Sequence, residues 1–191
     1  MHLGKILCSE LYLRGSTLTD PIYFDTDCLS SFLWIKREHI LYELYPGKLV
    51  VPYETYSELS KVRHLQVQTD NLIIQQKLKI EHIQVASQTF ELFLRLTTPK
   101  KGLAAIGNGE AACIALAVIK HGFFASNNMR DIAHYVELYN LSHLTTAIIL
   151  KEALCRSIIT EAEGNLMWVS MLQRRRKLPN DTFSDYLRAH G

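Results

Sequence analysis

Several acidic side chains fall where apolar segments of the sequence end, which is a common position for catalytic groups. Asp25 and Asp27 follow a short apolar run, Glu58 follows a second one, and Glu110 opens an alanine-rich stretch. Clustered carboxylates repel one another, so a cluster is stable only if it is protonated or holds a cation. Oxygen ligands favour a hard ion such as Mg²⁺ or Mn²⁺. Such an ion can activate water for hydrolysis of a phosphodiester.

Each acidic residue also has a structural role open to it. Asp27 fits the N-cap of a helix that begins at residue 28, and Asp25 fits a loop or capping position. Glu58 fits a solvated helix face, and Glu110 fits the favourable end of a helix dipole. Asp131 fits a helix-surface charge. The metal hypothesis therefore depends on the ordered set and not on any single residue.

Bringing these side chains together requires an alternation of strands and helices. The hydrophobic pattern predicts strands at residues 22–24, 49–51, 80–85, 123–125 and 141–144, and helices at 28–44, 52–61, 70–79, 87–96, 110–119, 129–139, 145–154, 161–177 and 182–187. This alternation favours a mainly parallel sheet covered by helices. Right-handed crossovers then place the carboxyl ends of the strands at one edge, where ligands of open α/β sheets bind.

Composition limits the classes of protein that the chain can represent. It has 191 residues, 48% of them hydrophobic, and 21 Lys and Arg against 19 Asp and Glu, for a net charge of +2. This excludes a disordered chain and argues against a generally polybasic nucleic-acid binder, although not against a nuclease. The four cysteines form no CxxC pair, and no apolar run approaches the roughly 20 residues of a membrane span. We expect a cytoplasmic protein with no membrane contact.

Four sequence blocks, in this order, resemble those of PIN-domain ribonucleases. They are Tyr23-Phe24-Asp25-Thr26-Asp27-Cys28-Leu29, then Val50-Val51-Pro52 with Ser57-Glu58-Leu59, then Gly107-Asn108-Gly109-Glu110-Ala111-Ala112, and finally Phe124-Ala125-Ser126-Asn127-Asn128. The third block is similar to that of the VapC-like branch, which carries Gly-x-Gly-Glu-Ala. The resemblance covers residues 22–159, and the tail is similar to the C-terminus of that branch. We therefore divide the chain into an unassigned extension at 1–21, a nuclease domain at 22–159 and a helical extension at 160–191 that packs on the same domain.

The resemblance implies a three-layer α/β/α fold and a metal-dependent endoribonuclease that hydrolyses RNA phosphodiester bonds. It further implies the toxin of a toxin–antitoxin pair, a homodimer held inactive by a small antitoxin protein. By matched position, Asp25, Glu58 and Glu110 are the expected ligands of Mg²⁺ or Mn²⁺. Asp27 stands where the family often has Asn or Ser, and we include it among the metal-binding candidates.

The fourth block departs from the family pattern, because Asn127-Asn128 replaces the expected acidic residues. A neutral Asn oxygen binds a hard cation less strongly than a carboxylate does. We assign Asn127 and Asn128 to the catalytic set, and we expect a second metal ion to be weak or absent unless Asp131 substitutes. The alternative hypothesis is a catalytically weakened PIN-like protein that serves as an RNA-binding or protein-binding module.

A second similarity concerns the haloacid-dehalogenase phosphatases, whose first strand also ends in an Asp-x-Asp pair. Those enzymes need a later Asp-Asp or Gly-Asp pair, and neither occurs anywhere in this chain. We therefore favour the nuclease interpretation.

Basic residues are the candidates for contacts to the RNA backbone. They are Lys36 and Arg37 on the first helix, Arg130 beside the proposed site, and Arg174, Arg175 and Arg176 in the tail. A basic run at the end of a helix is also a common solvated feature. Contacts of this kind position the sugar–phosphate backbone and do not read bases.

Overall fold

The computed structural model of the chain describes residues 20–98 and 106–190, and its centre is a parallel five-stranded sheet. The strands are β1 (Ile22–Phe24), β2 (Leu49–Pro52), β3 (Lys79–Glu81), β4 (Phe123–Ala125) and β5 (His143–Leu144), in the order β3-β2-β1-β4-β5. Phe24 pairs with Ala125 of β4, and Tyr23 pairs with Val50 of β2. The central strand β1 therefore ends at Asp25 with a neighbour on each side. The expected α/β fold with a parallel sheet is confirmed.

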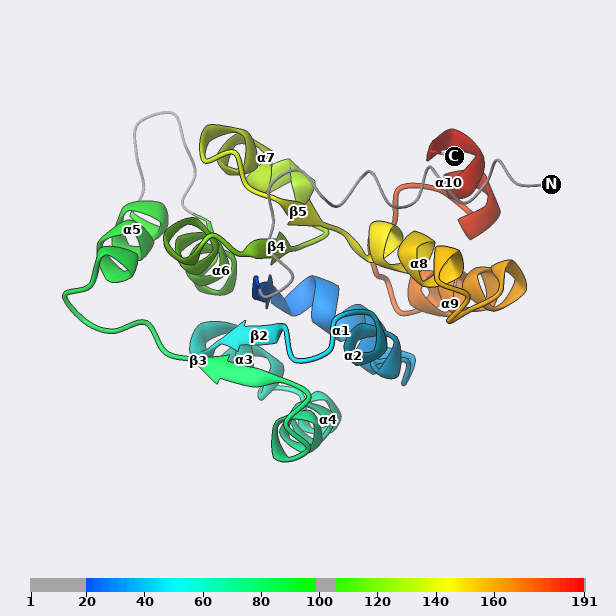
Figure 1. The fold of residues 1–191 in the computed structure, drawn as a ribbon, viewed down its shortest axis with the longest axis horizontal. Helices are drawn as coiled ribbons and strands as arrows, with labels where there is room; N and C mark the ends of the chain where they lie inside the picture. The colour runs from blue at the N-terminus through cyan, green and yellow to red at the C-terminus, as the bar shows by residue number, and fades with distance from the viewer. Residues whose placement is uncertain (1–19, 99–105, 191) are drawn as a thin grey trace.

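The described residues also form ten helices. They are α1 (Thr26–Trp34), α2 (His39–Leu44), α3 (Tyr53–Leu59), α4 (Arg63–Ile74), α5 (Gln88–Thr97), α6 (Asn108–Lys120), α7 (Met129–Leu138), α8 (Thr146–Cys155), α9 (Glu161–Gln173) and α10 (Phe183–His190). Figure 1 shows α5, α6 and α7 on one side of the sheet and α1, α2, α8 and α9 on the other. Alternate residues of β1 point to opposite faces. Ile22 and Phe24 pack with α1 and α8, whereas Tyr23 packs with α5 and α6.

Several predicted boundaries were wrong for local reasons. The helix expected at 28–44 is two helices, because Lys36 adopts a left-handed φ of 56° and the chain turns there. The helix expected at 70–79 is α4, which begins earlier and buries Leu65, Thr69 and Leu72 on one face. Thr69 enters that face because its hydroxyl donates a hydrogen bond to the Leu65 carbonyl at 2.8 Å. The strand expected at 80–85 is the shorter β3, and the helix expected at 161–177 ends at Gln173.

The C-terminal helices share a core with the face of the sheet that carries α1. Trp168 and Phe183 are fully buried and belong to the same apolar cluster as Leu29 of α1. Gly164 lets α10 approach, since a Cβ there would lie 2.3 Å from Phe183 Cδ1. Trp168 Nε1 donates to the Asn180 carbonyl at 2.8 Å, so the polar edge of this buried ring is satisfied.

Three further findings bear on the expectations from sequence. Residues 1–19 of the unassigned N-terminal extension lie outside the described part of the chain. Within the described part, Cys28 and Cys113 are buried free thiols, whereas Cys155 is disulfide-bonded. None of the helices that the structure describes is long and apolar enough to cross a membrane.

Candidate active site

Asp25 occupies the carboxyl end of the central strand and is almost completely buried, with 2% of its surface exposed. Its Oδ1 accepts a hydrogen bond from the Cys28 backbone N–H at 2.7 Å, so Asp25 is the N-cap of α1. The interpretation of Asp27 as that cap is wrong, because Asp27 lies in the first turn of the helix. Burial raises the pKa of Asp25 to about 7, hydrogen bonds from Ser126 and Cys28 oppose the shift, and the charges of Asp27 and Glu110 add to it.

Glu110 lies in the first turn of α6, half-buried, and is tied to the fourth sequence block by Asn128. Asn128 Nδ2 donates to Glu110 Oε1 and to Asp131 Oδ2, both at 2.7 Å. Burial raises the pKa of Glu110, the Asn128 hydrogen bond opposes that shift, and the nearby charges of Asp131 and Glu58 reinforce it. Asn128 therefore bridges two acidic side chains that would otherwise only repel each other.

Glu58 reaches the same region from α3. Thr26 Oγ1 donates a hydrogen bond to Glu58 Oε2. A Cβ at Gly109 would lie only 3.1 Å from each carboxylate oxygen of Glu58, so glycine makes room for this side chain. Thr26 and Gly109 lie within the sequence motifs, but the motifs alone predicted no role for either residue. Their positions beside Asp25 and Glu110 in the chain were the available signal.

Asn127 is held differently from Asn128. Its Nδ2 donates to Thr146 Oγ1, and its Oδ1 accepts from the Thr146 backbone N–H, both at 2.9 Å. The whole amide group therefore joins the end of β4 to the first residue of α8. Asn127 orients the loop that carries Asn128, and no carboxylate is among its hydrogen-bond partners in the described part of the chain.

The basic residues lie at different places around α1. Arg176 Nη1 donates to Asp27 Oδ1 and to Ser30 Oγ, both at 3.1 Å, which puts Arg176 beside the acidic residues. Arg174 lies over the Trp34 ring at the other end of the helix, 5.2 Å from its centre. The predicted RNA contacts Lys36, Arg130 and Arg175 are exposed.

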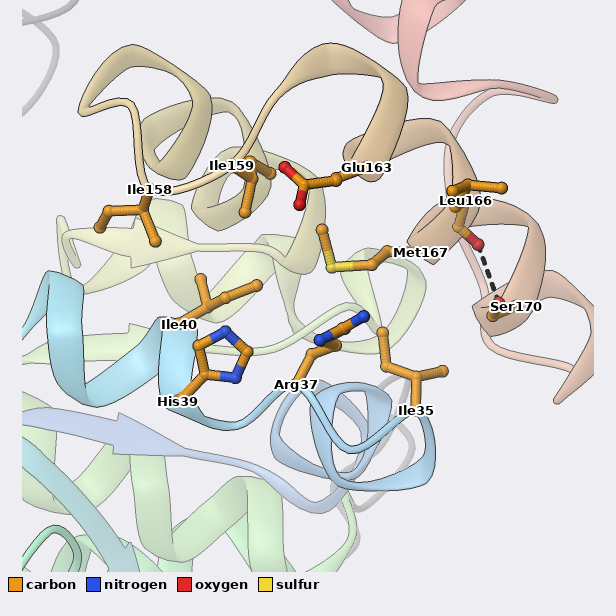
Figure 2. Close-up of a pocket in the computed structure, with 10 residues that line it drawn as sticks. All are labelled: Ile35, Arg37, His39, Ile40, Ile158, Ile159, Glu163, Leu166, Met167 and Ser170. Atoms are coloured by element: carbon orange, nitrogen blue, oxygen red, sulfur yellow. Dashed lines mark hydrogen bonds between the residues drawn. The ribbon is translucent and has the colours of Figure 1, made fainter.

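Arg37 lines a separate pocket of about 170 Å³ between the α1–α2 connection and the start of α9. Figure 2 shows Arg37 facing Glu163 across this pocket, with Ile40 and Met167 among the apolar side chains around them. Hydrogen bonds from Thr160 lower the pKa of Glu163, and the charge of Arg37 contributes to that shift. Arg37 therefore lies near the start of α9, where the side chains of Thr160 and Glu163 cap the helix by bonding to each other's backbone N–H groups.

We define the acidic cluster as Asp25, Asp27, Glu58, Glu110 and Asp131. The charges of Asp27 and Glu110 act on Asp25, and the charges of Glu58 and Asp131 act on Glu110. Among the described residues, no group of three or more His, Cys, Asp or Glu side chains is arranged to hold a metal ion. The carboxylates of Glu58, Glu110 and Asp131 instead accept hydrogen bonds from Thr26 and Asn128. The donor set nevertheless fits a hard cation, because it consists of carboxylate oxygens. Burial is the main cause that raises the pKa values of Asp25 and Glu110, and the neighbouring carboxylates add to both shifts.

Comparison with known proteins assigns the family. The sequence model of the PIN domain matches residues 21–191. The chain belongs to the PIN-domain family. No curated protein matches it at a significant level. PIN domains are generally nucleases and typically depend on divalent metal ions, and the acidic cluster of this PIN domain lies at the sheet edge where such chemistry is expected.

Gly109→Ala should impair cleavage by this PIN domain without unfolding it. The new methyl group would press on both oxygens of Glu58, which is predicted from the sequence to be a metal ligand, and a misplacement of about 1 Å at a reacting site can cost about a hundredfold in rate. Alanine favours a helix over glycine, so the thermal midpoint should not fall. RNA cleavage rates and thermal unfolding measure the two effects. Gly107→Ala is the control, because its Cβ would lie 3.8 Å from Glu110 Oε2; equal activity of both variants with the wild type would contradict the role of Gly109.

Proposed function

We propose that this PIN domain is a metal-dependent endoribonuclease that hydrolyses RNA phosphodiester bonds. The observation that carries the proposal is the convergence of Asp25, Glu58 and Glu110 at the end of the central strand, from three distant parts of the chain. These three residues would hold Mg²⁺ or Mn²⁺, with Asp27 and Asp131 at the edges of the site. When bound, the ion would lower the pKa of a water and stabilise charge on the phosphate.

The chain's own residues prepare the site in three ways. Thr26 and Asn128 hold the carboxylates of Glu58 and Glu110 in place through hydrogen bonds. Asp25 is buried with its capping bond to α1, so its position is set by the rigid sheet. Arg176 reaches Asp27 and supplies a cation at the rim, suited to bind a phosphate of the RNA backbone.

Single-stranded RNA incubated with the purified protein tests this proposal directly. We expect cleavage with Mn²⁺ or Mg²⁺ and none with excess EDTA. If RNA stays intact with every divalent ion, the endonuclease proposal fails. RNA binding that persists without cleavage would then support the weakened binding module, for which the Asn128 bridge between Glu110 and Asp131 is the favouring observation.

We further propose that the nuclease acts in the cytoplasm as the toxin of a toxin–antitoxin pair, as a homodimer bound by a small antitoxin. The support is the Gly-x-Gly-Glu-Ala block and an exposed apolar face on α9. Leu166, Val169 and Leu172 recur every three residues on this helix, and they are 70%, 46% and 37% exposed. Residues three apart lie on one side of a helix, so this face is suited to a protein partner.

Expression in a bacterial host is the test of the toxin proposal. We expect the wild type to arrest growth and Glu110→Gln to leave growth normal at equal protein level, because arrest requires RNA cleavage. Growth arrest by both proteins would contradict a nuclease toxin. A short gene that adjoins this one and relieves the arrest when co-expressed would identify the antitoxin.

A further inference from the structure

The basic residues at 174–177 follow α9, and one of them is held very differently from the others. Arg176 is half-buried, whereas the other three are exposed. Arg175 adopts a left-handed φ of 58°, and the Arg176 backbone N–H donates to the Met171 carbonyl at 3.0 Å. A bond of this kind closes the turn that ends many helices. The backbone of Arg176 is therefore fixed at the point where the chain leaves α9.

The guanidinium of Arg176 is bound on one side and accessible on the other. Its Nη1 donates to Asp27 Oδ1 and to Ser30 Oγ, and its Nε donates to the Arg174 carbonyl, all at 3.1 Å. Of its N–H groups, the two on Nη2 have no hydrogen-bond partner in the part of the chain that the structure describes. Nη2 is not among the buried polar atoms that lack a partner, so solvent reaches it. Arg176 is therefore a positioned cation with two donors left for a ligand.

A cation at this place matters because the acidic cluster repels any polyanion that approaches it. Of the ion pairs between described residues, only the one between Arg176 and Asp27 joins a basic side chain to this cluster. Asp27 lies in the first turn of the helix that Asp25 caps, so the guanidinium lies beside the proposed cleavage site. Charge-assisted N–H donors in a fixed fork suit a phosphate oxygen.

We infer that Asp27 is a positioning residue for Arg176 and not a ligand of the metal ion, and that Arg176 binds a phosphate of the entering RNA strand through Nη2. Asp27 Oδ1 already accepts a hydrogen bond from the guanidinium, and this positive charge opposes a second cation at the same carboxylate. The metal ion is then left to Asp25, Glu58 and Glu110. The inference rests on the proposed ribonuclease function and gives Asp27 a different role within it.

Two neighbouring serines test the positioning role without any change of charge. The hydroxyls of Ser30 and Ser31 both donate to the Asp27 backbone carbonyl, at 3.3 and 2.8 Å, but within the described residues only Ser30 also contacts Arg176. We expect Ser30→Ala to weaken binding of a short single-stranded RNA by about threefold or more, the effect of one lost hydrogen bond to a charged group. Ser31→Ala is the matched control and should bind like the wild type. Fluorescence anisotropy of the full chain in EDTA measures both.

Arg176→Gln removes the cation itself, so its effect should depend on salt. We expect RNA binding in EDTA to weaken about tenfold or more, and the slope of log affinity against log salt to fall by about 0.7, the value for one lost contact to a single strand. Arg95→Gln, on α5 where the side chain is 70% exposed, should change neither. Unchanged affinity and salt slope in Arg176→Gln, or no RNA binding by the wild type, would overturn the inference. These binding effects without cleavage by any divalent ion would refute the nuclease alone.

Mn²⁺ affinity tests the role of Asp27, because Asp25→Asn and Asp27→Asn make the same chemical change two residues apart. Electron paramagnetic resonance of free Mn²⁺ measures binding to each protein without RNA. We expect Asp25→Asn to weaken Mn²⁺ binding at least about tenfold. Asp27→Asn should weaken it by no more than about threefold, since a partly exposed charge that is not a ligand acts through screened electrostatics. Equal losses would make Asp27 a metal ligand and overturn the inference. If the wild type binds no Mn²⁺, the metal-dependent nuclease fails, and the RNA-binding measurements still decide the role of Arg176.

Discussion

Asp25→Asn should abolish metal-dependent RNA cleavage while the fold stays intact. Loss of one negative ligand removes several kcal/mol of stabilisation from the transition state, so we expect the rate to fall by at least about a hundredfold. Asparagine caps helices as well as aspartate does, and its side-chain oxygen can still accept the bond from the Cys28 N–H. The variant therefore separates the charge of Asp25 from its structural role. Cleavage of labelled RNA with Mn²⁺ and far-ultraviolet circular dichroism measure the two properties.

Glu110→Gln should show the same loss, because Glu110 is the second acidic residue that interacts with Asp25 at the sheet edge. Its matched control is Glu91→Gln on α5, where the carboxylate is exposed and pairs only loosely with Arg95 at 4.0 Å. We expect the control to cleave at the wild-type rate. Full activity of both Asp25→Asn and Glu110→Gln would contradict the proposed site, and the same loss in Glu91→Gln would point to a contaminating nuclease.

Asp25→Asn should also stabilise the metal-free protein, increasingly so as pH rises. The pKa of Asp25 is raised from its ordinary 3.8 to about 7, so the folded state holds a proton that the unfolded state releases within that range. Between about pH 4 and pH 7, Asp25 therefore lowers the free energy of unfolding as pH rises, by up to about 4 kcal/mol in total. The neutral asparagine is free of this cost.

Urea unfolding in EDTA at pH 4 and at pH 8 measures this effect as the difference between variant and wild type. The difference is needed because burial lowers the pKa of His143 to about 4, and His143 then opposes Asp25 in the same pH range. We expect the stability advantage of Asp25→Asn to be larger at pH 8 than at pH 4. Mn²⁺ should reduce that advantage, since a cation favours the charged form of Asp25. An advantage that is independent of pH would show that Asp25 ionises normally in the folded protein.

Much of the fold was predictable because the apolar residues that form a periodic pattern in the sequence are the ones buried in the structure. The strand ending at Phe24 and the helix containing Ala111 to Ala117 were identified, since short apolar runs and a long apolar helix differ in length and period. The pattern was less informative where a polar group enters the core. Thr69 is buried through a hydrogen bond to Leu65, and this obscured the start of α4.

The family resemblance, the parallel sheet and the position of Asp25 at the end of a strand were all predictable from the sequence, because they depend on residue order and periodicity. The contacts between polar groups, in contrast, became known from the three-dimensional structure. It separated Asn127, bound to Thr146, from Asn128, bound to Glu110, although the two residues are chemically identical and adjacent. It also brought Arg176 to Asp27 across 149 positions of the chain. Contacts between distant segments depend on how helices pack on the sheet, and no local spacing in the sequence encodes that packing.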